Sequence, residues 1–181
     1  MFGGNGCLSS GEKSLYPGVR KALTDYFRQS DDQIAIMLDI TANEFPQSSQ
    51  VLLQSNVLYL LDSREFRPDW FGVSSRLVWT YRPRLQAYGR RDFVLTAEVK
   101  LGAPALRDLF QAKMYGELYW APVSLLVCTE QPEERLRRLL SERLDLFGYS
   151  GGNYQLYLCR YLESTGTIDW WLDGRSPRWK K

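Results

Sequence analysis

The sequence predicts one mixed α/β domain, in which a central mixed β-sheet is flanked by helices. Three observations predict this class. Apolar and alternating segments typical of strands are interleaved with segments of helical periodicity. The 181 residues suit one domain with its own core, and no internal repeat or linker divides them. Residues 1–11, rich in Gly and Ser, are expected to be a flexible tail, so the domain is expected over residues 12–181.

Helices are expected in three segments that contain or follow a proline. The first runs from about Pro17 to Gln29, where Pro17 suits the first turn and apolar residues recur at helical spacing. The other two run from about Pro104 to Tyr119 and from about Pro132 to Phe147. In the middle helix, an apolar stripe is expected to pack on the sheet, formed by Leu106, Phe110, Met114 and Leu118.

Strands are expected between these helices, in segments rich in β-branched and aromatic residues. The expected strands are residues 33–40, 70–74, 77–81, 93–101, 122–128 and 154–161. The segment 122–128 is apolar almost throughout, which is typical of a strand buried on both faces. The residues after Tyr161 are expected to form a tail rich in Trp and charged residues.

Histidine is absent from the whole sequence, and this excludes several classes of hydrolase. Ser-His-Asp hydrolases, Cys-His proteases and His-ligated zinc enzymes all need an imidazole. The three cysteines are an odd number without a C-x-x-C spacing, which argues against a disulfide framework and a zinc cluster. Hydrolysis would therefore depend on carboxylates, lysine and a hard cation such as Mg²⁺ or Mn²⁺.

Charge and hydropathy indicate where the protein acts and what it binds. No apolar run is long enough to cross a bilayer, and the first residues lack the layout of a signal peptide, so we expect a cytoplasmic protein with no membrane partner. The net charge is only +2, so a nucleic-acid-binding surface would have to be local.

Such a local surface is indicated between residues 76 and 91, which hold five arginines, three aromatic residues and no acidic residue. Arginine pairs with phosphates, and aromatic faces stack on bases. A solvated hairpin that is basic by chance is an equal alternative. The candidate nucleic-acid-binding residues are Arg76, Arg82, Arg84, Arg90 and Arg91.

The candidate chemical site begins on the strand 93–101. Residues two apart on a strand point to one face, so Glu98 and Lys100 project together, whereas Val99 and Leu101 are expected to point to the core side. Taken alone, a Glu-x-Lys pair is more often an exposed ion pair on an edge strand.

Two further features favour a chemical role. Asp69 follows a proline directly before a predicted strand, and Gln111 and Tyr115 lie one turn apart on the next helix. Because 28 residues separate Asp69 from Glu98, an extra hairpin is expected between them. If Asp69 is not the acid, Asp92 and Asp62 are the alternatives.

In the segments RPDW, AEVKLG and QAKMY the chain resembles the PD-(D/E)XK nuclease superfamily, with the Q-x-x-x-Y element of RecB-type members. The segment EKSLYPGVRKALTDYF also resembles the first helix of many members, which carry a glutamate, here Glu12, ahead of a Leu-Tyr-Pro run. The resemblance covers roughly Glu12 to Cys128 and implies a restriction-endonuclease-like core of order αβββαβ.

The resemblance implies a Mg²⁺- or Mn²⁺-dependent nuclease that hydrolyses phosphodiester bonds in DNA. The metal would be held by Asp69, Glu98 and the carbonyl of Val99. By the same resemblance, the candidate catalytic residues are Asp69, Glu98, Lys100, Gln111, Tyr115 and Glu12.

The last four of these residues have different implied roles. Lys100 would act on the nucleophilic water or on the transition state. Gln111 and Tyr115 would position the metal site or the substrate, and Glu12 would add a ligand or an outer contact.

Two alternatives stay open. One is a nuclease-like domain that has lost catalysis and binds nucleic acid or a protein partner. The other is a structural protein in which Asp69 lies far from Glu98. Under any of these readings, the aromatic content is compatible with a homodimer.

Overall fold

The computed structural model describes residues 10–30, 35–40, 59, 62, 68–76, 91–119, 121–143, 146–147 and 155–172. This part of the chain is a mixed α/β structure, which confirms the predicted class. Its six strands form one sheet in sequence order: β1 (Ala35–Ile40), β2 (Trp70–Arg76), β3 (Arg91–Lys100), β4 (Val123–Cys128), β5 (Gln155–Leu162) and β6 (Thr167–Trp171). Its helices are α1 (Ser10–Ser30), α3 (Leu106–Leu118) and α4 (Glu134–Glu142).

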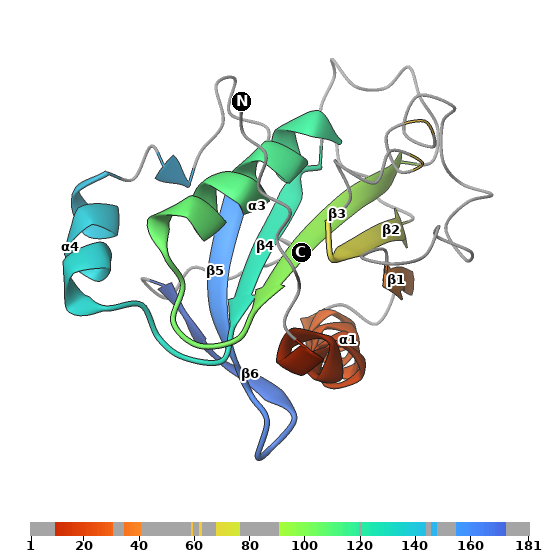
Figure 1. Ribbon diagram of the computed structural model, residues 1–181. Coiled ribbons are helices and arrows are strands. Elements are labelled where there is room, and N and C mark those ends of the chain that lie inside the picture. Colours follow the sequence, from red (N-terminus) through yellow and green to blue (C-terminus); the bar gives the residue numbers. More distant parts are fainter. Residues whose placement is uncertain are drawn as a thin grey trace.

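The sheet combines antiparallel and parallel pairing. Strands β1, β2 and β3 pair antiparallel, β3 to β5 are parallel, and β6 returns antiparallel to β5. Parallel neighbours need a crossover connection. Helix α3 lies in the connection from β3 to β4, and α4 in the connection from β4 to β5 (Figure 1).

Each face of the sheet has its own hydrophobic cluster. On one face, the buried side of α1 packs against alternate residues of β3 and β4, among them Leu95, Val99 and Leu125. On the other face, Leu109 and Ala112 of α3 belong to a second cluster, with side chains of β4 and β5. Figure 1 shows α3 lying across β4 and β5. The sheet is therefore a middle layer between helices.

Strand β4 lies at the centre of this arrangement. Every residue of β4 is buried, and both of its neighbours pair parallel to it, as the apolar segment predicted. Cys128 at its end and Cys159 on β5 are free, buried thiols, in agreement with core roles.

The first helix does not start at Pro17, as we expected, but at Ser10, so the last two residues of the expected tail are helical. Proline inside a helix cannot donate to the carbonyl four residues back. The helix continues through Pro17 because Leu15, Tyr16 and Val19 on either side are all buried in one cluster. Burial thus outweighs the missing hydrogen bond.

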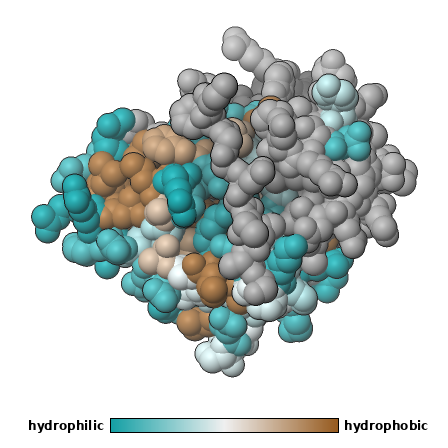
Figure 2. Space-filling view, in the orientation of Figure 1, coloured by the Kyte–Doolittle hydropathy of each residue, from teal (hydrophilic) through white to brown (hydrophobic). Residues whose placement is uncertain are grey.

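The predicted packing of the middle helix is wrong. Leu106, Phe110 and Met114 are 38%, 52% and 42% exposed, and Figure 2 shows an apolar patch over α3 beside α4. Helix α3 instead approaches the sheet through Leu109, small residues and Tyr115. The Ser124 hydroxyl on β4 donates to the Ala112 carbonyl at 2.7 Å, and this bond helps to fix the face that α3 presents to the sheet.

Three element ends also differ from expectation. Leu101 is 51% exposed, because β3 ends at Lys100 and the chain bends away. Helix α4 ends at Glu142, and Phe147 beyond it turns back to the sheet, where its carbonyl accepts a bond from Leu156. The expected C-terminal tail contains strand β6, whose aromatic residues complete both clusters.

The predicted strand 77–81 lies outside the described residues, as does the tip of the expected hairpin. The described ends of that hairpin, β2 and β3, pair in antiparallel register from Trp70 opposite Ala97 to Arg76 opposite Arg91. Within the described part of the chain, no helix has the length and hydropathy needed to cross a membrane.

Gly18 provides a test of the packing between α1 and β5. A side chain at Gly18 would overlap the hydroxyl of Tyr161, which is buried and has little room to move. Glycine-to-alanine changes in helices usually stabilise by up to about 1 kcal/mol. Here we expect Gly18→Ala to lower the free energy of unfolding by about 1–3 kcal/mol, because overpacking outweighs propensity.

Urea denaturation followed by circular dichroism measures this change. The double variant Gly18→Ala/Tyr161→Phe lacks the overlapped hydroxyl and should recover part of the loss. A single variant that is as stable as the wild type would contradict the close approach of α1 to Tyr161.

Candidate functional site

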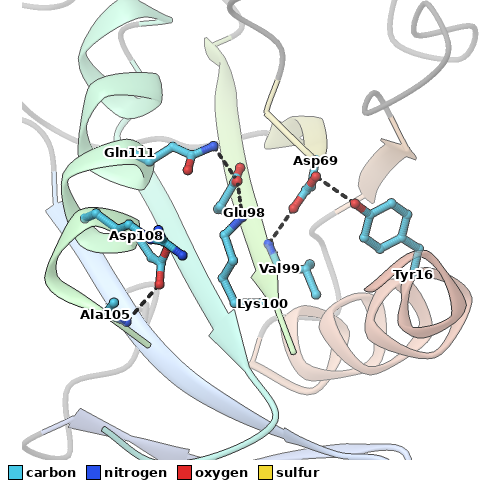
Figure 3. Close-up of polar contacts among 9 residues, drawn as sticks. Tyr16, Asp69, Glu98, Val99, Lys100, Ala105, Asp108 and Gln111 are labelled. Carbon is cyan, nitrogen blue, oxygen red and sulfur yellow. Dashed lines mark hydrogen bonds and ion pairs between the residues drawn. The ribbon is translucent and has the colours of Figure 1, made fainter. Parts of the chain in front are cut away.

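Glu98 is a carboxylate buried in the middle of the sheet. It lies on the face of β3 that points to α3, and the residue is 2% exposed. Its Oε1 accepts a hydrogen bond from Gln111 Nε2 at 2.7 Å and lies 3.0 Å from Lys100 Nζ (Figure 3). Lys100 points to the same face, as the two-residue spacing predicted. One carboxylate oxygen therefore receives both donors.

Asp69 lies immediately before β2 and is also buried. Strand β2 begins at Trp70, opposite Ala97, so Val99 lies two residues beyond the paired part of the strands. At that position the Asp69 carboxylate replaces a strand carbonyl as the acceptor: its Oδ2 accepts the amide of Val99 at 2.8 Å. Its Oδ1 accepts the hydroxyl of Tyr16 on α1 at 2.7 Å. Figure 3 shows the two donors reaching the carboxylate from different elements.

Four predicted residues therefore gather around the end of β3: Asp69, Glu98, Lys100 and Gln111. They come from the β2 entrance, from β3 and from α3. The alternative of an exposed ion pair on an edge strand is wrong, because β3 lies between β2 and β4 and Glu98 is buried. Asp69 does not lie far from Glu98 either, since it bonds the next residue's amide.

Tyr115 and Glu12 lie close enough to this group to interact with it electrostatically. Tyr115 is buried, and burial first, then the charge of Glu98, raises its pKa to about 12. Glu12 is partly exposed in the first turn of α1, and its charge contributes to raising the pKa of Tyr16 and of Asp69.

The other predicted residues are not part of the described site. Asp62 is exposed, and the side chain of Asp92 lies outside the described residues. The side chains of the five candidate nucleic-acid-binding residues also lie outside, so their role stays a prediction: Arg76, Arg82, Arg84, Arg90 and Arg91.

Two acids buried side by side favour the protonated state. Burial, followed by the charge of Asp69, raises the pKa of Glu98 to about 8, although Lys100 and the backbone amide of Asp69 oppose the shift. Burial also raises the pKa of Asp69, against the lowering effect of the bonds from Val99 and Tyr16. Burial lowers the pKa of Lys100, but the neighbouring carboxylates outweigh it and the net shift is upward.

Sequence reasoning missed Tyr16. Tyr16 lies just before the helix that we expected from Pro17, and the structure places its ring in the core cluster on α1. The available signal was its spacing from Glu12, because residues four apart share a helix face. Because Glu12 was expected at the site, Tyr16 on the same helix face was a candidate site residue as well.

The donor set fits a hard cation. Among the described residues, Glu98 Oε2 is a buried side-chain oxygen without a hydrogen-bond partner. Leaving a buried acceptor unsatisfied costs about 1–3 kcal/mol, and more when it is charged. No group of three or more acidic, His or Cys side chains that could hold a metal is found in the described part of the chain. A cation here would therefore complete its shell with the Val99 carbonyl and water.

Comparisons of the chain with protein-family models, with curated proteins and with solved structures find no match.

The buried acids predict how stability depends on pH in EDTA. Since folding raises the pKa of Glu98 from 4.5 to about 8, the folded state holds a proton that the unfolded state releases in this range. Stability should therefore fall as pH rises from 4.5 to about 8. Glu98→Gln, which is neutral, should flatten this slope and melt above the wild type at pH 8.

Thermal melts by circular dichroism across this range provide the measurement. The raised pKa of Asp69 acts in the same direction, so a residual slope is expected in the variant. Identical pH profiles for the two proteins would mean that Glu98 is not buried beside a second acid.

Proposed function

We propose that the chain is a divalent-metal-dependent nuclease of the PD-(D/E)XK kind, which hydrolyses phosphodiester bonds in DNA with Mg²⁺ or Mn²⁺. The observation that carries the proposal is Glu98 Oε2, a buried carboxylate oxygen without a hydrogen-bond partner among the described residues, next to a second buried acid. A hard cation would satisfy this oxygen and compensate the two neighbouring negative charges.

The order of the described elements supports a restriction-endonuclease-like core. From α1 to β4 they run as one helix, three antiparallel strands, a second helix and a parallel strand. This is the order αβββαβ that the resemblance implies, with the acids at the β2 entrance and on β3.

The residues divide the chemical work between holding the cation and handling charge. Asp69, Glu98 and the Val99 carbonyl would hold the cation, which supplies a Lewis acid and lowers the pKa of bound water. Gln111 keeps Glu98 Oε1 oriented, which leaves Oε2 available. Lys100 has a side chain that is 17% exposed against 3% for Glu98, so its ammonium can reach the phosphate and stabilise charge there.

Removal of the Lys100 amine tests the mechanism. We expect Lys100→Ala to reduce cleavage by about 10²- to 10⁴-fold, the range typical of a positioned proton-transfer or charge-stabilising group. The assay uses labelled single-strand, duplex and branched DNA with Mg²⁺, Mn²⁺ or EDTA. Lys21→Ala is the matched control, because Lys21 is an exposed lysine paired with Asp25 on α1.

Cleavage by the wild type should stop in EDTA, and Lys21→Ala should cleave like the wild type. If Lys100→Ala cleaves at the full rate while it melts normally, the mechanism is wrong.

Calorimetric titration with Mn²⁺ separates the nuclease from a domain that only binds nucleic acid or a partner. We expect the wild type to bind Mn²⁺ and Glu98→Gln to lose this site, because the amide lacks the charge that a hard cation requires. Binding that is unchanged in Glu98→Gln would place the metal elsewhere. A wild type without any Mn²⁺ site, yet able to bind DNA, would support the binding-only alternative.

A further inference from the structure

We propose that Tyr16 is a positioning residue, which fixes the orientation of the Asp69 carboxylate and thereby the affinity of the site for a divalent cation. The part that concerns the cation rests on the proposed function, whereas the part that concerns Asp69 rests on geometry alone.

The geometry shows a carboxylate held at both oxygens. Tyr16, 3% exposed, donates its hydroxyl to Oδ1 at 2.7 Å, and the Val99 amide donates to Oδ2 at 2.8 Å. The two donors belong to different elements, α1 and β3. Rotation of the carboxyl group would therefore break both hydrogen bonds. Without the Tyr16 bond, Asp69 would be held only through Oδ2 and could rotate about its last side-chain bond.

The hydroxyl is more than the polar end of a core side chain. The ring of Tyr16 packs in the cluster between α1 and the sheet, a place that phenylalanine would fill equally well. A buried hydroxyl is costly unless it is hydrogen-bonded. Here it donates to the carboxylate of Asp69, immediately before β2, as Figure 3 shows. The hydroxyl therefore has a specific partner that the ring does not need.

The chemistry of the donor also matters. A phenol is neutral at physiological pH, so it orients Asp69 without cancelling its charge. A lysine or arginine in the same position would form an ion pair and reduce the attraction of Asp69 for a cation. Partners of this kind, which hold a metal ligand without touching the metal, commonly change metal affinity by about 10- to 100-fold.

Tyr16→Phe removes the hydroxyl and keeps the ring. Tyr161→Phe is the matched control, because Tyr161 is buried in the same cluster but comes from β5. The first readout needs no metal: hydrogen exchange at the Val99 amide, measured by NMR in EDTA. The second is calorimetric titration with Mn²⁺, and thermal melts check that both variants fold.

For Tyr16→Phe we expect exchange at Val99 to be about two- to tenfold faster, because the carboxylate that accepts this amide is less well held. The Leu125 amide on β4 should exchange as before. We also expect Mn²⁺ affinity to fall by about tenfold or more. Tyr161→Phe should change neither readout.

The readouts separate the two proposals. If Tyr16→Phe leaves Val99 exchange unchanged, Tyr16 does not position Asp69, and the inference is overturned. If Val99 exchange rises but Mn²⁺ affinity equals that of the wild type, the link from Asp69 to the cation is overturned. If the wild type itself binds no Mn²⁺ while Val99 exchange still rises, the positioning role stands and the proposed nuclease fails.

Discussion

The carboxylate of Asp69 joins three elements that are distant in the sequence, and the arrangement of the site depends on it. It accepts the Val99 amide just beyond the end of the pairing between β2 and β3, and it accepts the Tyr16 hydroxyl from α1. These bonds fix where β2 enters the sheet and how α1 lies against it. The neighbouring residue, Glu98, is then held beside a second acid in a place with little access to water. Removal of Asp69 would therefore disturb strand pairing, helix docking and charge at the same time.

Burying two acids side by side raises the free energy of the folded state, and the surrounding residues offset only part of this effect. Gln111 and Lys100 both serve one oxygen of Glu98, and the other oxygen has no partner in the described part of the chain. Well-packed proteins leave few buried polar atoms unsatisfied. A purely structural ion pair would have little reason to place both donors on one oxygen. This asymmetry supports the cation site that we propose, in which one oxygen is oriented while the other stays available.

Much of the fold and of the site could be predicted from the sequence, because both depend on local patterns. The buried strand β4 was visible as an apolar segment, and the side-by-side projection of Glu98 and Lys100 follows from the strand period. The errors arise where tertiary contacts decide. Periodicity found an apolar stripe on α3, but Glu98 holds Gln111 and Ser124 holds the Ala112 carbonyl, and this orientation turns Phe110 outward. Pro17 indicated a helix start, but residues before it are buried. Spacing could have placed Tyr16 on the helix face of Glu12, but local spacing does not indicate that its hydroxyl donates to a residue 53 positions away in the sequence.

A series of hydrogen bonds runs from Tyr16 on α1 through Asp69 and β3 to Gln111 on α3. It crosses the sheet and reaches the helices on both of its faces. Each outer layer is anchored by its own apolar cluster, so either helix could loosen while most of the sheet persists. Loosening of either helix would break this series of hydrogen bonds. Heating should thus break these hydrogen bonds before the sheet itself melts, and a ligand that bridges the two acids would couple the layers so that they unfold together.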